Sequence, residues 1–160
     1  MQEAYAHCEA LVREADKDRF LAALFAPADR RPHLFALYAF NIEISRVGQV
    51  AREPLAGEIR LQWWRDALAG HAPGEATANP VAAALIDTIA RCGLPKDALG
   101  VLIDAHARDL YDEPVATLGE LETYGRETAS TVFALAARIL DAGMLVGEVA
   151  DPAGTAYALA

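Results

Sequence analysis

Helix-start and helix-stop signals recur along almost the whole chain. Asn79 followed by Pro80 combines a helix cap with a proline in the first turn, and Gly93 follows as a stop. The "TLGE" of 117–120 is a capping box. The chain also has 35 alanines among its 160 residues and few β-branched runs. Together these features predict an all-α protein.

Apolar periodicity places the individual helices. Residues 2–16 carry one apolar stripe at spacings of three and four, and Asp18 is expected to cap a short helix that Pro27 stops. Asp151 and Pro152 are expected to start a last helix. The other helices are expected at 29–51, 54–68, 80–93, 95–111 and 117–140, with 69–80 as the only extended loop and Gly143 as a stop.

Length and charge limit the class of protein. A chain of 160 residues fits a single domain, 1–160, that buries a real core. The net charge of −9 argues against general affinity for nucleic acid. Residues 1–70 carry a net charge of −1 and residues 71–160 carry −8. A diphosphate site needs both kinds of charge, and a solvated acidic surface explains the second half equally well.

Several features point to the compartment. No uncharged apolar run approaches the roughly 18 residues needed to span a bilayer, and the N-terminus is neither a secretory signal nor a transit peptide. Cys8 and Cys92 have no metal or redox spacing. We therefore expect a soluble, cytoplasmic protein with reduced cysteines, and peripheral contact with a membrane stays open.

One acidic cluster is a candidate metal site. Asp109, Asp112 and Glu113 are spaced so that a continuous helix would place them on one face, within reach of Mg²⁺. Asp109 and Asp112 are the catalytic candidates of this group. The alternative is ordinary surface charge at the end of a helix before a proline.

Arginines of the first half are candidate anion ligands. Arg46 and Arg60 lie on neighbouring predicted helices and are expected to converge on a phosphate-bearing substrate. Tyr38, on the inward side of the same helix as Arg46, is the third substrate-binding candidate. The alternative is that the arginines pair with nearby carboxylates, namely Glu43, Glu53, Glu58 and Asp66.

The adjacent Trp63 and Trp64 cannot face the same direction on a helix. One is expected in the core. For the other, core or partly exposed packing is preferred over a position at a groove, an interface or a membrane surface.

The stretch "DRFLAALFAPADRRPHLFALYAFNIEISRV", with "LQWWRDAL", "LIDAHARDL" and "TLGELETYGRETAS", resembles the squalene and phytoene synthase family. That resemblance implies an isoprenoid-synthase-type helical bundle and head-to-head joining of two isoprenoid diphosphates with Mg²⁺ as cofactor. It covers nearly all of this chain and about the first half of a family member. It therefore implies that the chain is the N-terminal part of the full fold.

The resemblance breaks at the aspartate-rich motif that follows "YAF" in the family. The expected aspartates fall on Ser45, Arg46 and Gln49, and Arg19 stands where the family has a serine before Phe20. None of the three motif positions carries a carboxylate that could bind a metal ion. The guanidinium at position 46 would repel a metal cation. The sequence is more similar to a divergent branch that includes the mitochondrial complex I assembly factor and its α-proteobacterial relatives. The residues that carry this likeness are Asn41, Glu43, Glu53, Gly57, Arg60, Gln62 and Trp64.

Three functions follow from the resemblance. The first is a noncatalytic assembly or interaction protein with a protein partner or an isoprenoid ligand and no metal cofactor. The second is a Mg²⁺-dependent prenyltransferase of the squalene/phytoene synthase type. The third is a noncatalytic binder of a phosphorylated lipid.

Overall fold

The computed structural model describes residues 1–51, 53–71, 73–111, 115–141 and 147–159, and every regular element within these ranges is helical. The all-α prediction is confirmed. In chain order the elements are α1 (Gln2–Ala15), α2 (Lys17–Ala23), α3 (Arg31–Ser45), α4 (Val47–Val50), α5 (Pro54–Ala69), α6 (Pro73–Ala78), α7 (Pro80–Cys92), α8 (Lys96–Ala107), the 3₁₀ turn η1 (Arg108–Leu110), α9 (Leu118–Gly125), the π-helical turn η2 (Arg126–Ser130), α10 (Thr131–Leu140) and α11 (Gly147–Leu159).

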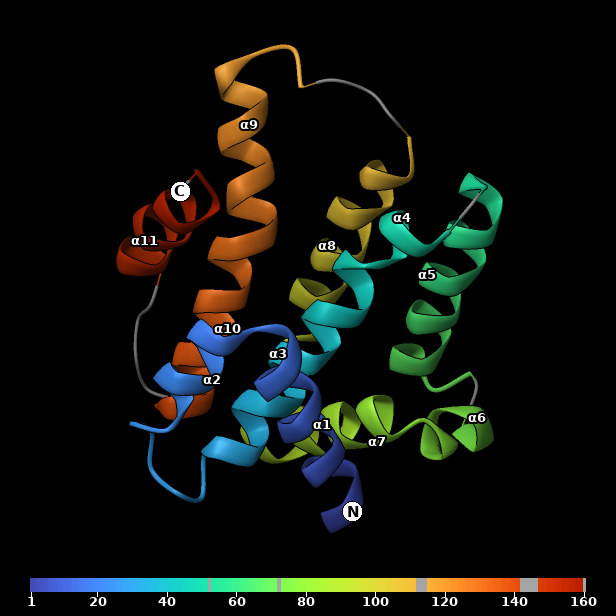
Figure 1. Ribbon diagram of the computed structural model, residues 1–160, viewed down its shortest axis with the longest axis vertical. Helices are drawn as coiled ribbons and strands as arrows, with labels where there is room; N and C mark the ends of the chain where they lie inside the picture. The colour runs from blue at the N-terminus through green and yellow to red at the C-terminus, as the bar shows by residue number, and fades with distance from the viewer. Residues whose placement is uncertain (52, 72, 112–114, 142–146, 160) are drawn as a thin grey trace.

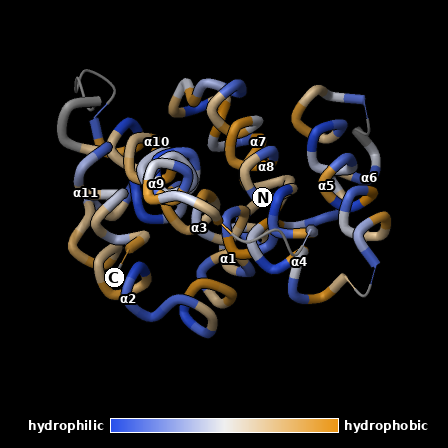
Figure 2. The backbone as a smooth tube through the Cα atoms, turned by 90° about the horizontal axis from the view of Figure 1, so that it is seen from above, coloured by the Kyte–Doolittle hydropathy of each residue, from blue (hydrophilic) through white to orange (hydrophobic). Residues whose placement is uncertain are grey.

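The bundle is built around α3. This helix packs against α1, α7, α8 and α10, and Leu37, Phe40 and Ile44 on it are almost completely buried. Figure 1 shows α9, η2 and α10 as one long rod beside α3 and α8, with α5 on the far side of α8. The view from above in Figure 2 places α2 and α11 next to the rod and α5 and α6 at the opposite side. An apolar helix surrounded by others in this way belongs to the core of a helical bundle.

Local signals set many helix ends as predicted. Asn79 accepts a hydrogen bond from the amide of Ala82 at 3.0 Å and starts α7, which ends at Gly93 with φ of +61°. The Thr117 hydroxyl accepts from the Glu120 amide at 3.2 Å, and the Glu120 carboxylate accepts from the amide of Ala116. These contacts satisfy backbone donors that a helix leaves unpaired at its start.

The predicted helix 29–51 is wrong as one element. It is two helices, α3 and α4, that meet at Arg46. The Ser45 hydroxyl donates to the Ile42 carbonyl at 3.2 Å, and Gly48 lies against the Asp109 carbonyl. Packing of α4 onto η1 therefore redirects the chain where the local pattern favours continuation.

Three smaller predictions are also wrong. Asp16, and not Asp18, caps α2, because the backbone is non-helical at Asp16 and its carboxylate accepts from the Arg19 amide at 3.0 Å. Residues 69–80 contain α6, whose Ala76 is buried. The start signal at Asp151 and Pro152 lies inside α11, where tertiary packing against η2 overrides it. The predicted stop at Gly143 lies outside the described residues.

Within the described part of the chain, no helix is both long enough and apolar enough to cross a membrane.

Candidate functional site

The three positions where carboxylates were expected lie at the junction of α3 and α4. Ser45 is half-buried, and its hydroxyl donates a hydrogen bond to the Ile42 carbonyl. Arg46 and Gln49 are exposed. Tyr38 and Ser45 are seven residues apart and share one face of α3, whereas Arg46 lies three residues after Glu43 on another. The junction therefore distributes the motif positions over more than one surface.

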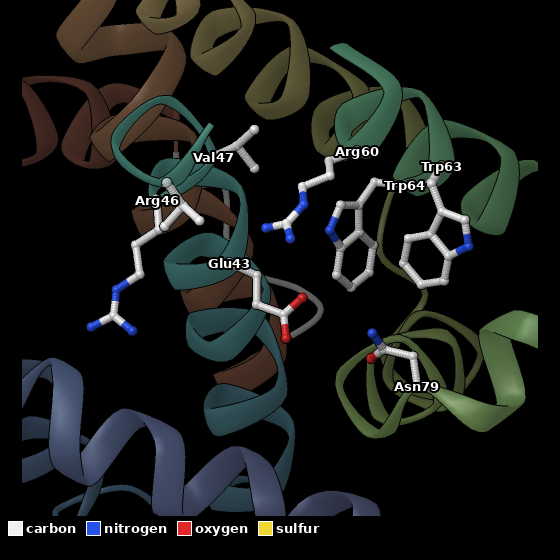
Figure 3. A pocket seen from close by; sticks show the side chains of 8 residues that line it. Glu43, Arg46, Val47, Arg60, Trp63, Trp64 and Asn79 are labelled. Carbon is white, nitrogen blue, oxygen red and sulfur yellow. The ribbon is translucent and has the colours of Figure 1, made fainter. Parts of the chain in front are cut away.

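Arg46 lines a pocket of about 420 Å³ between the α3–α4 junction, α5 and the start of α7. We call it the indole pocket because Trp63 and Trp64 form one wall, as Figure 3 shows. The remaining lining residues are Glu43, Val47, Val50, Arg60 and Asn79.

The two indoles have different roles. Trp64 is 3% exposed and meets Phe40 edge to face, with the ring centres 5.0 Å apart. Trp63 is half-buried, and its Nε1 donates to the Glu75 carboxylate at 3.1 Å, which ties α5 to α6. The prediction of one core tryptophan is confirmed, and the other has the partly exposed packing that was preferred for it, at the edge of a pocket.

The indole pocket is lined by two arginines and one carboxyl group, Glu43. Neither Arg46 nor Arg60 forms a salt bridge with any residue that the structure describes. Burial raises the pKa of the half-buried Glu43 carboxyl, and the nearby His7 and Arg60 oppose that rise. Figure 3 shows Arg60 directed toward Glu43, while the Arg46 guanidinium points to the other side of α3. The two arginines line one pocket, and their guanidinium groups do not converge on one point.

Other predicted pairings are replaced by different partners. Arg65 forms a salt bridge with Asp104 at 2.6 Å, although Asp66 is adjacent in sequence. The Asp66 carboxylate accepts instead from the Gln62 amide at 2.9 Å. The Glu58 carboxylate accepts from the Tyr111 hydroxyl.

Tyr38 lies in a second pocket, of about 220 Å³, bounded by α2, α3, α10 and α11. The Arg19 guanidinium lies over the Tyr38 ring at 5.5 Å and over the Tyr157 ring at 5.0 Å, and forms a 3.3 Å salt bridge with Asp16. Burial raises the pKa of the Tyr38 hydroxyl, and the charge of Arg19 opposes this rise. The structure therefore separates Tyr38 from Arg46 and Arg60.

Asp109 belongs to a hydrogen-bonded cluster between η1 and α9. Its carboxylate accepts from the Tyr124 hydroxyl at 2.9 Å and lies 2.8 Å from His106 Nδ1. Burial raises the pKa of the Tyr124 hydroxyl, and the Asp109 charge acts in the same direction. His106 is 6% exposed, and its Nε2 has no hydrogen-bond partner among the described residues. Sequence reasoning missed Tyr124, because nothing in the local pattern links it to a residue fifteen positions away.

Only Asp109 of the acidic cluster lies within the described residues. The α-helix ends at Ala107, and η1 changes the spacing at Asp109. Asp112 and Glu113 lie outside the described residues. Over the described ranges, no group of three His, Cys, Asp or Glu side chains is arranged to hold a metal ion. The side chains at Ser45, Arg46 and Gln49 do not fit Mg²⁺, which is bound through carboxylates.

Comparison with known proteins shows which family has this architecture. A family model described as squalene/phytoene synthase matches residues 12–160. The chain belongs to the squalene/phytoene synthase family. The helical bundle, with its central α3, is thus an isoprenoid-synthase-type fold.

The chain is similar in sequence to two kinds of protein, complex I assembly factors and a bifunctional CrtB/UppS protein. The human protein named NADH dehydrogenase (ubiquinone) complex I, assembly factor 6 is 31% identical over 134 residues, which are 84% of this chain and 40% of the relative. Its Drosophila melanogaster homologue is 31% identical over 135 residues. The bifunctional protein CrtB/UppS of Streptomyces coelicolor is 32% identical over 117 residues, 72% of this chain and 20% of the relative. The chain spans about two fifths of the length of the assembly-factor relatives.

Proposed function

We propose that this member of the squalene/phytoene synthase family acts in the assembly of a protein complex, as complex I assembly factors do, and does not join isoprenoid diphosphates. The observation that carries the proposal is the side chain at position 46. An exposed guanidinium stands where the family resemblance requires a carboxylate, and the flanking motif positions are Ser45 and Gln49. The names of the assembly-factor relatives support the same role.

The physical reason lies in the chemistry of ionisation. Loss of an allylic diphosphate leaves a highly charged group, and a bound metal contributes several kcal/mol to stabilising that charge. A guanidinium at position 46 binds an anion but repels the metal. On this proposal the protein needs no metal cofactor at the α3–α4 junction.

Two measurements test the proposal. Deletion of the gene in its own organism should lower the amount of assembled complex I on native gels, and the wild-type gene should restore it. The purified product of the whole gene should release no diphosphate from farnesyl or geranylgeranyl diphosphate with Mg²⁺ present. Mg²⁺-dependent diphosphate release would overturn the noncatalytic assignment and favour the prenyltransferase alternative.

A further inference from the structure

Several polar groups that line the indole pocket form no hydrogen bond or salt bridge with a residue that the structure describes. They are the Glu43 carboxylate, the Arg60 guanidinium, the Trp64 indole N–H and the side-chain amide nitrogen of Asn79. These groups come from α3, from α5 and from the residue that caps α7. Polar groups inside a protein are normally paired, so a pocket that gathers several unpaired ones is a candidate ligand site.

The indole N–H of Trp64 is the most informative of these groups. Trp64 is 3% exposed, yet its Nε1 is not sealed in the core, because His106 Nε2 is the one fully buried side-chain nitrogen or oxygen without a partner among the described residues. Nε1 therefore opens onto the pocket that Trp64 lines, and Figure 3 shows it on the side of the ring that faces Arg60. An indole N–H is a donor only, so the pocket offers a fixed donor to an acceptor atom of a ligand.

Arg60 and Glu43 present opposite charges to the same pocket. Figure 3 shows the Arg60 guanidinium directed toward Glu43, whereas Arg46 points to the other side of α3. Arg60 opposes the rise in the pKa of the Glu43 carboxyl that burial causes, but the two side chains do not form a salt bridge. A ligand that enters the pocket therefore meets a positive group and a negative group, each with free hydrogen-bonding capacity.

This balance of charge argues against a ligand of a single sign. An anion would be attracted by Arg60 and repelled by Glu43, and a cation would experience the reverse. A ligand that carries both a carboxylate and an ammonium group satisfies both residues. Its carboxylate accepts from Arg60 and from Trp64 Nε1, and its ammonium group donates to Glu43. An ammonium group beside Glu43 also favours the charged form of that carboxyl.

The rest of the pocket suits an apolar body. Val47, Val50 and the Trp63 ring line it together with the ring of Trp64. Trp63 is held by its hydrogen bond to Glu75, and Trp64 packs on Phe40, so the aromatic wall is preorganised and little conformational entropy is lost on binding. The volume of about 420 Å³ lies within the roughly 300 to 1,000 Å³ of small-molecule sites.

We propose that the indole pocket binds a small zwitterion with an apolar body, which is the chemistry of an apolar α-amino acid, with its carboxylate on Arg60 and Trp64 and its ammonium group on Glu43. The inference goes beyond the proposed assembly function and does not depend on it. It follows from the geometry of one pocket and requires no catalysis.

The experiment measures the binding of L-phenylalanine and L-leucine to the product of the whole gene by isothermal titration calorimetry. Two analogues with the same ring and linker as L-phenylalanine are the matched probes. 3-Phenylpropanoate lacks the ammonium group, and 2-phenylethylamine lacks the carboxylate. Each analogue should bind at least about tenfold more weakly than L-phenylalanine, because each leaves one charge of the pocket without a partner.

Two pairs of variants locate the binding. Arg60→Gln and Glu43→Gln should each weaken the binding of L-phenylalanine by about tenfold or more. Arg126→Gln on η2 and Glu122→Gln on α9 make the same substitutions at exposed positions that do not line the pocket, and should leave the binding unchanged. Circular dichroism and urea unfolding check that all four variants fold.

A change in selectivity separates direct contact from a structural effect. In Glu43→Gln, 3-phenylpropanoate should lose its disadvantage relative to L-phenylalanine, because the carboxylate that repels it is gone. In Arg60→Gln, 2-phenylethylamine should lose its disadvantage for the corresponding reason. A variant that merely damaged the pocket would weaken all the probes by the same factor.

Three results would overturn the inference. The first is the absence of saturable binding of both L-phenylalanine and L-leucine. The second is a wild-type protein that binds either analogue as tightly as it binds L-phenylalanine. The third is full retention of L-phenylalanine binding in both Arg60→Gln and Glu43→Gln, which would place the amino acid at another site.

Discussion

Gly48 on α4 lies so close to the backbone of Asp109 that a Cβ at position 48 would come within 2.8 Å of the Asp109 carbonyl oxygen. On the next helix, Gly57 is packed in a similar way against the side chain of Leu110. The turn η1 therefore rests on two glycines, one from α4 and one from α5. These contacts set the angle between the two helices and, with it, the shape of the indole pocket.

Gly48→Ala should lower the free energy of unfolding by roughly 1 to 2 kcal/mol, because the clash with backbone outweighs the gain in helix propensity. Gly100, inside α8, has no atom within 4 Å of an added Cβ. Gly100→Ala should stabilise the protein by about 0.5 to 1 kcal/mol. Urea unfolding measures both, and equal effects would show that η1 does not constrain α4.

Substitution of the two tryptophans should have unequal effects on stability. Trp64→Ala removes a buried ring that packs on Phe40 and should cost about 3 to 5 kcal/mol. Trp63→Ala removes a half-buried ring with one hydrogen bond and should cost less than about 2 kcal/mol. Thermal and urea unfolding measure both losses. A larger loss of unfolding free energy in Trp63→Ala than in Trp64→Ala would contradict the prediction.

Asp109 should stabilise the fold without metal. In buffer containing EDTA, Asp109→Asn should lower the free energy of unfolding by about 1 to 3 kcal/mol, because its charged carboxylate accepts from Tyr124. A double-mutant cycle with Tyr124→Phe should give a coupling of about 0.5 to 3 kcal/mol. A residue that acted only as a metal ligand would show no effect until Mg²⁺ was added.

The stability of the α1–α3–α7 contact should depend on the protonation of His33. Its Nδ1 lies 3.0 Å from the Tyr5 hydroxyl and 2.9 Å from the Thr88 hydroxyl. Burial lowers the pKa of this imidazole below its ordinary value, so the unfolded chain binds the proton more tightly than the folded one. The contribution is complete above the unfolded pKa of roughly 6.5 and is lost as pH falls from there toward the lower folded value.

The measurement is the urea midpoint at pH values of about 7.5 and about 5.5, on either side of the ordinary histidine pKa. The midpoint of the wild type should fall on acidification, and the fall should be smaller in His33→Gln. His71→Gln, at an exposed position, should behave as the wild type does. An unchanged fall in His33→Gln would show that another group is responsible.

Local chemistry predicted the fold well where a helix end depends on its own residues. The cap at Asn79, the stop at Gly93 and the capping box at Thr117 each involve atoms within a few positions of one another, and all are confirmed. The cap of α2 was predicted two residues too late. Asp18 has the right side chain for a cap, but the non-helical backbone lies at Asp16.

The candidate site was predictable only in part. The pairing of Tyr124 with Asp109 and the separation of Tyr38 from Arg46 both depend on how α3 packs against its neighbours. Spacing along one helix cannot predict such contacts, because it gives the face that a residue occupies but not the element opposite that face. The approach of Arg60 to Glu43 across the indole pocket was hidden for the same reason.

The sequence by itself determined that the chain is helical, where most helices begin and end, and that carboxylates are missing at 45, 46 and 49. These properties depend on side-chain identity and on hydrogen bonds between near neighbours. Only the tertiary structure decided that the helix breaks at Arg46, that Trp63 and Arg60 face one pocket, and that Asp109 meets Tyr124. Those outcomes depend on packing between elements far apart in the chain, where the close approach of Gly48 to Asp109 outweighs the local preference for an unbroken helix.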